Sequence, residues 1–430
     1  MREAQLRNGE NAARLVKRPF EHAASPDSSA SENIPARSEE RILAQVKAPS
    51  SMPTACEATG EKEKSCNPAL RAGSRVARAN CERGFGMKRV QLPFLPQIQV
   101  PFSDRARALA QVEELAKRGV RAPLVVFGPE GCGKSAWLRQ SAEILREHGY
   151  DVVYVDLTHR NYLPYTDIES VASKLSEAAS IPGMESVKLA ALVVELAKEL
   201  VKLGKKRVAV LVDEAFRPIG VGKAAVYVKS LLSLIEYPPR SYERIVAIAT
   251  TSEGLTRSEI GRHRWADLAP MWNMPREGFI ELYEQVNWKE GGYPPPSGFT
   301  PEDAWLITGR NPYMLARLAE AQWSPEKLAR RMLSLRKLQY FVNSLSADEK
   351  RWLQDATEDP DTLFTRERIP LLNKLVKRNL VVDDIPPRSA DLWIDTPPPE
   401  KDADLGIGKH VAWQTPIHRE AVKTALKASA

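Results

Sequence analysis

The chain has 430 residues, of which 43% are hydrophobic and 27% are charged. This composition excludes a peptide scaffold and a mostly disordered chain, and the length allows two or three domains of ordinary size. The formal net charge of +7 is small for a chain of this length. Composition alone therefore gives no indication of a nucleic-acid-binding protein.

The first 86 residues differ sharply from the rest of the chain. Of all the phenylalanines, tryptophans and tyrosines, only Phe20 and Phe85 precede Met87. A segment with so few rings cannot bury enough apolar surface to offset the entropy cost of ordering, so we expect residues 1–86 to be disordered. Two interpretations stay open: a flexible regulatory tail, and sequence upstream of a natural start at Met87. The abrupt change in composition favours the second.

Segment 1–86 also lacks a targeting signal. It combines 11 acidic residues with no long apolar run, unlike a signal peptide or an arginine-rich transit sequence. Elsewhere the sequence has no uninterrupted apolar stretch of about 18 residues, the length that a membrane span needs. We therefore predict a soluble, cytoplasmic protein without a membrane partner.

A glycine-rich loop follows a predicted strand at residues 122–127. The loop reads GPEGCGKS at residues 128–135 and leads into an amphipathic stretch, which is the GxxxxGK[ST] pattern in its strand–loop–helix context. Glycines let backbone N–H groups turn toward phosphates, and the following helix adds its positive end. We expect Lys134 to bridge the β- and γ-phosphates and the Ser135 hydroxyl to complete the shell of Mg²⁺. The predicted nucleotide-binding residues here are Gly128, Pro129, Glu130, Gly131, Cys132, Gly133, Lys134, Ser135 and Ala136.

A second predicted strand ends in two adjacent acids. Residues 208–212 are all apolar, and Asp213 and Glu214 follow directly. This pattern is typical of a buried parallel strand whose carboxyl end faces the ligand. We expect Asp213 to hold the metal ion and Glu214 to polarise the attacking water, because phosphoryl transfer depends on positioning and charge stabilisation. Together with the loop, the two acids predict a nucleotide hydrolase.

Alternating strands and helices surround these two motifs. Strands are predicted at residues 150–157 and 244–251, and helices at 167–179, 185–203 and 223–235. The alternation predicts an α/β fold in which a parallel sheet forms the middle of three layers. The ligand would then lie at the carboxyl ends of the strands.

The strand at 244–251 ends in Thr250 and Thr251. Either hydroxyl could lie near the γ-phosphate, and the alternative is a threonine that caps the next turn. A guanine-reading Asn-Lys-x-Asp segment is missing, because the one Asn-Lys pair, at residues 373–376, reads NKLV. ATP is therefore the expected nucleotide.

Three segments outside these motifs form a further pattern. Residues 101–109 read PFSDRARAL, residues 268–271 read LAPM ahead of an amphipathic stretch at 276–286, and residues 308–313 read TGRNPY. Together they resemble the archaeal ATPase family of the STAND-type, AAA+-like P-loop NTPases. The resemblance covers about residues 101–425, and the last segment, similar to the family's G-G-N-P signature, is its most specific part.

The resemblance carries implications for fold and site. It implies that Pro312 starts a helix of a small helical lid, which packs over the nucleotide and couples its state to the rest of the chain. It also implies an adenine-side role for Phe102 and Arg105. The sequence departs from the family at Arg310, which replaces the second glycine of the signature, and at residues 106–107, where the family favours glutamate.

Three arginines follow the strand that ends at Thr251: Arg257, Arg262 and Arg264. They are candidates for sensing the γ-phosphate, either in cis or from a neighbouring subunit. The alternative is that they decorate a solvated surface.

From residue 339 the pattern changes to short helices and strands. A capping box at 346–349 opens one helix, a second helix is predicted at 370–378, a strand at 380–383, and a hairpin from 391–395 and 410–416. This is the outline of a winged helix, which the family commonly carries here. Lys374, Lys377 and Arg378 would be exposed on the second helix, where they could enter a major groove. Residues 330–430 carry 17 basic and 15 acidic groups, so DNA binding and protein docking both stay open.

These expectations divide the chain into an extension at 1–86, an ATPase core at 87–270, a lid at 271–335 and a winged-helix-like domain at 336–430. The leading hypothesis is an ATP-dependent molecular switch: ATP and Mg²⁺ bind between sheet and lid, slow hydrolysis resets the switch, and the C-terminal domain reports its state. One alternative is an ATP-dependent DNA-binding protein, such as a transcriptional regulator or an origin-recognition-like factor. Another is a helper ATPase of a mobile element or defence system, which a nucleotide-dependent homo-oligomer would indicate.

Overall fold

The computed structural model describes residues 88–429, with the exception of 159–160, 166–167, 181–185, 218 and 253. The expected disorder of residues 1–86 and the start at Met87 lie outside the described residues. The first residues of the helices expected at 167 and 185 lie outside them as well.

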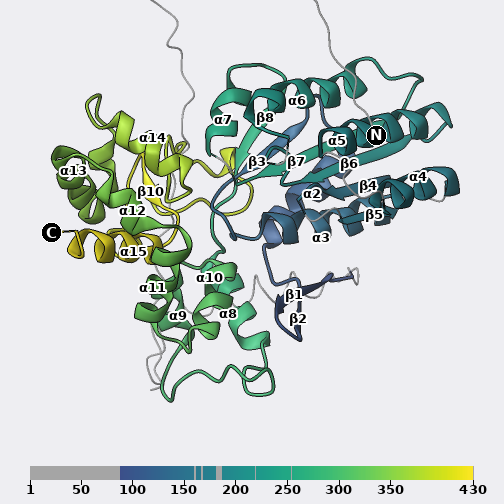
Figure 1. The fold of residues 1–430 in the computed structure, drawn as a ribbon. Helices are drawn as coiled ribbons and strands as arrows, with labels where there is room; N and C mark the ends of the chain where they lie inside the picture. Colours follow the sequence, from purple (N-terminus) through teal and green to yellow (C-terminus); the bar gives the residue numbers. More distant parts are fainter. Residues whose placement is uncertain are drawn as a thin grey trace, which may run out of the picture. The chain divides into compact units, whose positions relative to one another are not determined.

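A six-stranded sheet with the order β5-β4-β6-β7-β3-β8 forms the centre of the fold. Its strands are β3 (Leu124–Phe127), β4 (Asp151–Asp156), β5 (Asn161–Tyr165), β6 (Arg207–Asp213), β7 (Arg244–Thr251) and β8 (Asp267–Pro270). All neighbouring strands are parallel except β4 and β5, which are antiparallel. The predicted α/β fold with a parallel central sheet is confirmed (Figure 1).

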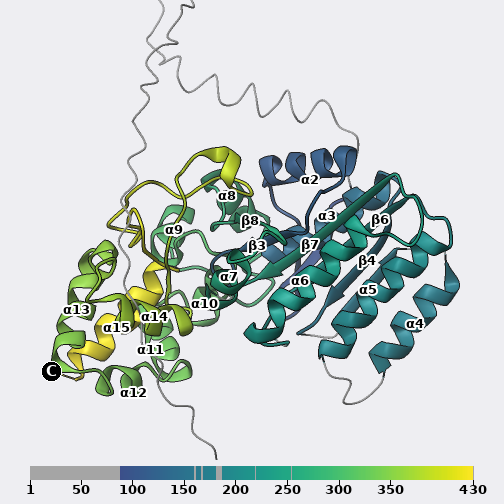
Figure 2. The ribbon, with the colours of Figure 1, turned by 90° about the horizontal axis from the view of Figure 1, so that it is seen from above.

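Helices cover both faces of this sheet. Val208, Val210 and Val212 of β6 pack in one apolar cluster with α4 (Glu169–Ser180), α5 (Ser186–Lys202) and α6 (Val221–Glu236). Ala209 and Leu211 pack in another cluster with α2 (Ala106–Arg118) and α3 (Lys134–Glu147). Successive residues of a strand point to opposite faces, which is why a strand covered on both sides is apolar throughout. In Figure 2, α4, α5 and α6 lie side by side along one face, with α2 on the other side.

A two-stranded hairpin precedes the sheet. Its strands, β1 (Gln91–Leu95) and β2 (Ile98–Pro101), are antiparallel. Leu95 and Val100 bury their side chains in the same apolar cluster as Phe279 and Leu282 of α8 (Arg276–Gln285). This hairpin was not predicted from the sequence.

The second half of the chain is mostly helical. After α7 (Gly254–Gly261) and α8 come α9 (Pro301–Thr308), α10 (Pro312–Glu320), α11 (Pro325–Leu335), α12 (Leu338–Asn343), α13 (Ala347–Glu358), α14 (Ile369–Lys377) and α15 (Pro416–Lys427). The Asn311 side chain caps α10 by accepting a hydrogen bond from the backbone N–H of Met314, directly before Pro312. The predicted capping box of Ser346 and Glu349 is present at the start of α13. One apolar cluster joins the buried faces of the helices from α8 onward, including α11 and α15, whereas Ile260 of α7 lies in the cluster of α5 and α6.

The C-terminal strands pair differently from the prediction. β9 (Val381–Val382) pairs with β10 (Ala412–Trp413), and Ile394 forms a parallel bridge with Met271 at the end of β8. The predicted hairpin of 391–395 with 410–416 is therefore wrong. Trp393 packs edge to face against Trp272, and Ile394 is buried in the cluster beneath the sheet. Both side chains are thereby removed from water, which favours this arrangement.

We refer to residues 383–411, which connect β9 to β10, as the strap. It includes the short 3-10 helix η2 (Ala390–Leu392) and crosses from the C-terminal helices to the end of β8 in the six-stranded sheet. None of the helices that the structure describes combines the length and the apolar character that a membrane crossing requires.

Candidate nucleotide-binding site

The glycine-rich loop lies between β3 and α3, at the carboxyl edge of the sheet. Gly131 and Gly133 have φ angles of 77° and 103°, in the left-handed region that glycine adopts at low cost. A Cβ atom on Gly131 would lie 2.4 Å from Cβ of Tyr313, and one on Gly128 would lie 1.9 Å from the carbonyl oxygen of Met271. Close packing of the loop against neighbouring elements therefore requires glycine at 128 and 131.

Lys134 is the first residue of α3, and its side chain folds back over the loop. Its Nζ atom donates to the carbonyl oxygen of Gly128 at 3.0 Å and to that of Pro129 at 2.8 Å. Only 4% of the residue is exposed, and a buried ammonium group needs such partners. The ammonium group therefore lies inside the loop, where the phosphates of a nucleotide would be held.

Asp213 at the end of β6 accepts hydrogen bonds from hydroxyl groups on three elements. Its Oδ1 atom accepts from Ser135 Oγ at 3.0 Å and from Thr250 Oγ1 at 2.6 Å, and its Oδ2 atom accepts from the Tyr154 hydroxyl at 3.1 Å. Thr250 reaches the acid because β7 lies between β3 and β6. The two residues predicted to hold a metal ion, Ser135 and Asp213, thus lie in hydrogen-bond contact. Thr251 is buried at the end of β7, opposite Phe127 in the strand register.

Glu214 has a φ angle of 43°, in the left-handed region that non-glycine residues seldom occupy. Its carboxylate oxygens lie 2.9 and 3.0 Å from the Ser252 Oγ atom, which donates to them, and its N–H donates to Thr250 Oγ1 at 3.1 Å. Burial raises the pKa of the Glu214 carboxyl, while the Lys134 ammonium and the Ser252 hydrogen bond act in the opposite direction. A half-buried carboxylate in the cavity wall, with a raised pKa, is suited to accept a proton.

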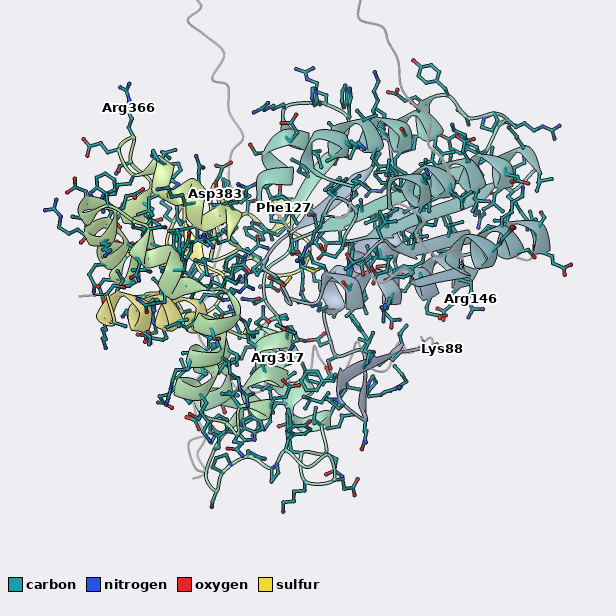
Figure 3. The ribbon with its side chains drawn as sticks, viewed as in Figure 1. Lys88, Phe127, Arg146, Arg317, Arg366 and Asp383 are labelled. Atoms are coloured by element: carbon teal, nitrogen blue, oxygen red, sulfur yellow. The ribbon has the colours of Figure 1, made fainter. Side chains whose placement is uncertain are left out.

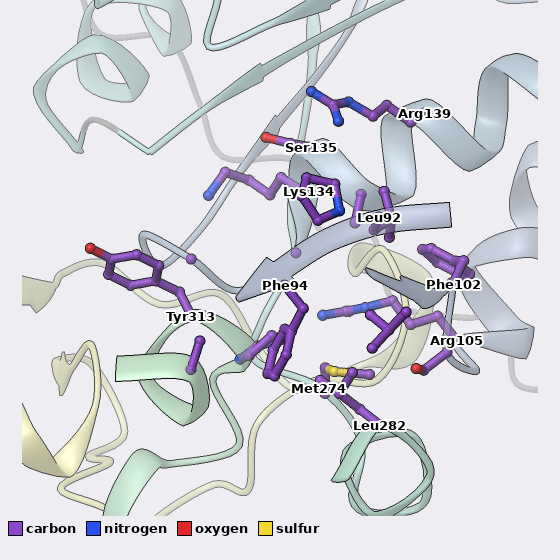
Figure 4. A pocket seen from close by; sticks show the side chains of 18 of the residues that line it. Leu92, Phe94, Phe102, Arg105, Lys134, Ser135, Arg139, Met274, Leu282 and Tyr313 are labelled. Carbon is purple, nitrogen blue, oxygen red and sulfur yellow. The ribbon is translucent and has the colours of Figure 1, made fainter. Parts of the chain in front are cut away.

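A cavity of about 300 Å³ opens beside these groups. Lys134, Ser135 and Glu214 line its polar part, and Pro312 and Tyr313 of α10 lie in its wall. The apolar part is lined by Leu92, Phe94, Phe102, Met274 and Leu282 (Figure 4). A polar part for phosphates next to an apolar slot for a base fits a nucleoside triphosphate.

Elements from the second half of the chain hold Glu130, at the tip of the loop. Its N–H donates to Oε1 of Gln414 at 3.0 Å, its carbonyl accepts from Nδ2 of Asn311 at 2.9 Å, and its carboxylate pairs with Arg336 at 2.7 Å. Tyr313 packs directly on the neighbouring Gly131. The phosphate-binding loop is thus bonded to the start of α10, to the residue after α11 and to the residue after β10.

Arg105, expected on the adenine side, lies in the cavity wall but directs its guanidinium group toward other protein groups. Nη1 donates to Asp395 of the strap at 2.8 Å, and Nη2 donates to the carbonyl oxygen of Cys132 in the loop. The side chains of Arg105 and Asp395 are 2% and 3% exposed. Arg105 therefore bridges the strap and the phosphate-binding loop.

The three arginines after β7 have different surroundings. Arg257 pairs with Asp383 of the strap at 2.7 Å, and its guanidinium carbon lies 5.1 Å from the ring centre of Phe127. Phe127 and Asp383 lie near each other where the core meets the C-terminal helices (Figure 3). Arg262, directly after α7, pairs with Glu259 of that helix at 3.2 Å, and Arg264 is exposed.

The donor set at Asp213 fits a magnesium ion. Ser135 supplies a hydroxyl oxygen and Asp213 a carboxylate oxygen, and Mg²⁺ typically takes one or two such protein ligands together with phosphate oxygens and water. In the described part of the chain, no cluster of three or more histidine, cysteine, aspartate or glutamate side chains forms a metal cage. The geometry therefore suits a cation that arrives with the nucleotide.

The parallel sheet, the glycine-rich loop and the acids at the end of β6 define a P-loop nucleotide-binding protein. The family described as "ATPase domain predominantly from Archaea" matches residues 102–318, slightly more than half of the chain. The chain belongs to this family of ATPases. No curated protein matches the sequence.

Solved structures with a similar fold share little sequence with this chain. Cdc6p from Pyrobaculum aerophilum is 12% identical, with 79% of this chain and 99% of that chain covered and a TM-score of 0.31. The ORC1 protein of Aeropyrum pernix, solved in complex with DNA, is 15% identical, with coverages of 76% and 92% and a TM-score of 0.32. A RuvB mutant from Thermotoga maritima is 12% identical, with coverages of 58% and 73% and a TM-score of 0.31.

Several site residues were not predicted from the sequence. Ser252 and Tyr154 contact the two acids, and Leu92 and Phe94 of the β1–β2 hairpin line the cavity. For Ser252, the polar run after the apolar part of β7 was a usable signal. Tyr154 lies within an apolar strand pattern, and nothing in the local sequence sets it apart.

Proposed function

We propose that this protein is an ATP-dependent molecular switch whose C-terminal half responds to the nucleotide bound at the loop. Lys134 would contact the phosphates, Ser135 and Asp213 would hold Mg²⁺, and Glu214 would polarise the attacking water. Thr250 would keep the two acids in place through its contacts with Asp213 and the Glu214 N–H. Membership of an ATPase family supports hydrolysis as the reaction, and we propose that it is Mg²⁺-dependent and slow.

The contacts between Glu130 and the second half of the chain are the observation that supports the proposed switch. Its N–H, its carbonyl oxygen and its carboxylate are bonded to Gln414, Asn311 and Arg336, respectively. A phosphate group bound in the loop must be enclosed by the same backbone. A change of the loop between its ATP and ADP forms would therefore be passed directly to α10, α11 and the segment between β10 and α15.

Hydrogen exchange tests the switch. We expect saturating ATP and saturating ADP to give different protection of α10 and of residues 412–427 in the full chain. Glu130→Ala should reduce this difference because it removes the link to Arg336. Glu147→Ala, which changes an exposed acid at the far end of α3, should leave the difference as in the wild type. Equal protection of the wild type with both nucleotides would contradict the proposed switch.

DNA is a second candidate partner, favoured by the exposed face of α14 in the proposed winged-helix-like region. Lys374 and Lys377 on that helix and Arg378 at its end are exposed, as is Arg366, which points away from the molecule in Figure 3. Lys374 also pairs with Glu349 at 2.6 Å, and Arg378 lies over the ring of Phe341, so part of this charge is already engaged.

A mobility-shift titration at several salt concentrations tests this candidate. Reversing Lys374, Lys377 and Arg378 to glutamate should lower DNA affinity by at least about tenfold and flatten its salt dependence, because phosphate contacts release counterions. Reversal of Lys198, Lys202 and Lys205, around the end of α5, is the charge-matched control. Equal affinities of the two triple variants would favour protein docking as the role of α14.

A further inference from the structure

The two oxygens of the Asp213 carboxylate have unequal surroundings. Oδ1 accepts three hydrogen bonds, from Ser135 Oγ at 3.0 Å, Thr250 Oγ1 at 2.6 Å and the Glu214 N–H at 3.1 Å. Oδ2 accepts from the Tyr154 hydroxyl at 3.1 Å. Tyr154 comes from the middle of β4, the strand next to β6. The orientation of the carboxylate is therefore set from two sides, by the loop and β7 on one and by β4 on the other.

The direction of the Tyr154 hydrogen bond is fixed by Arg139. Nε of Arg139 donates to the Tyr154 hydroxyl oxygen at 3.2 Å. A guanidinium group has no acceptor, so the phenolic oxygen must be the acceptor in that contact. The phenolic proton is then left for Oδ2 of Asp213. The chain of donors runs from Arg139 through Tyr154 to Asp213.

Because Tyr154 and Asp213 are buried, the hydrogen bond between them is costly to break. Tyr154 and Asp213 are each only 1% exposed, so water cannot replace a lost partner of either group. Arg139 lies on α3, one turn after Ser135, and lines the nucleotide cavity (Figure 4). This series of hydrogen bonds thus begins at Arg139 in the cavity wall and ends on the Asp213 carboxylate beside the Ser135 hydroxyl.

We propose that Tyr154 is a positioning residue that aims the Asp213 carboxylate at the divalent cation of the nucleotide, with Arg139 holding the tyrosine hydroxyl in the required direction. The inference rests on the proposed function, because it takes Asp213 as the metal-holding acid. A hydroxyl that offers its oxygen to a cation keeps its proton, so Ser135 could hold the cation and still donate to Oδ1. Thr250 and the Glu214 N–H hold Oδ1 as well, whereas the Tyr154 hydroxyl is the hydrogen-bond donor that the described residues supply to Oδ2.

Loss of such an outer contact typically lowers metal affinity 10- to 100-fold. In Tyr154→Phe, the Mg²⁺ concentration for half-maximal tightening of a fluorescent ATP analogue should therefore rise at least about tenfold. Affinity for the analogue in EDTA should stay within about twofold of the wild type, because the hydrogen bonds that the structure shows for the Tyr154 hydroxyl go to Asp213 and Arg139 and the ring that fills the apolar cluster is retained.

Tyr150→Phe is the matched control. Tyr150 directly precedes β4, is 3% exposed, and donates its hydroxyl proton to the carbonyl oxygen of Ala116 at 2.7 Å, away from the acids. Like Tyr154→Phe, the Tyr150→Phe variant loses one buried hydroxyl group, so it shows the effect of a general loss of stability. Its Mg²⁺ titration should match that of the wild type.

Arg139→Met provides a second variant in case Tyr154→Phe folds poorly, which melting curves of both tyrosine variants would reveal. It should shift the Mg²⁺ titration in the same direction and by less, since the tyrosine itself remains. If the Mg²⁺ titration of Tyr154→Phe coincides with that of Tyr150→Phe, the role proposed for Tyr154 is wrong and the proposed function is unaffected. The same holds for Arg139→Met if Tyr154→Phe does not fold. A wild type that binds the analogue no more tightly in Mg²⁺ than in EDTA would overturn the proposed function, and this inference with it.

Discussion

Glu214→Gln is expected to bind ATP with nearly wild-type affinity while its kcat falls at least about 100-fold, the lower end of what a general base contributes. The amide fills the same volume but cannot accept the proton of the attacking water. The structure places the carboxylate in the cavity wall, held by Ser252 and by an unusual backbone angle of 43°. Equilibrium binding of ATP and steady-state phosphate release, measured on the same preparation, separate the two effects.

Two further variants frame this result. Lys134→Ala should lose ATP binding itself, because it removes the ammonium group that lies inside the loop. Glu243→Gln neutralises an acid that precedes β7, at the opposite end of the strand from Thr250, and should turn over ATP as the wild type does. If Glu214→Gln hydrolysed ATP at the rate of Glu243→Gln, another group would have to be the base.

Asp395→Ala is expected to lower the free energy of unfolding by ~3–5 kcal/mol, the cost of leaving one partner of a buried ion pair without the other. Arg105 would keep its charge in a site where its side chain is only 2% exposed. The backbone N–H of Asp395 also binds Gln111 at 3.0 Å, so the whole segment of the strap is fixed against α2. Urea unfolding followed by circular dichroism measures the change.

The exposed pair of Lys401 and Asp359 is the control for this prediction. Its side chains are 56% and 39% exposed, and Lys401 also lies in the strap. Lys401→Ala should cost less than ~1 kcal/mol, as exposed ion pairs do. The double variant Arg105→Met with Asp395→Leu should recover part of the loss, because no unpaired charge then stays buried. Equal urea midpoints for Asp395→Ala and Lys401→Ala would show that the buried ion pair stabilises the fold no more than the exposed one.

The parts of the site that could be predicted are those written in consecutive residues. The loop at 128–135 and the strand that ends in Asp213 each combine a sequence pattern with a local structure, and the structure brings Ser135 and Asp213 together. The start of α10 was predictable for the same reason, since Asn311 and Pro312 are a local helix-start signal.

The parts that could not be predicted depend on strand order and on long-range packing. Tyr154 contacts Asp213 because β4 and β6 are neighbours, and no local pattern determines that. The predicted C-terminal hairpin was wrong because Ile394 pairs with Met271 and is buried beneath the sheet, while Trp393 packs against Trp272. In the β1–β2 hairpin, Pro93 and Pro101 obscure the strand pattern, although edge strands tolerate proline.

We propose above that the loop and the acids at the end of β6 hydrolyse ATP. The most direct test is steady-state release of phosphate from ATP in Mg²⁺ by the full chain, with Lys134→Ala purified in parallel. We expect phosphate release by the wild type, little release in EDTA, and none above background for Lys134→Ala. Release at the same rate by both proteins, or none by the wild type even when DNA is present, would contradict it.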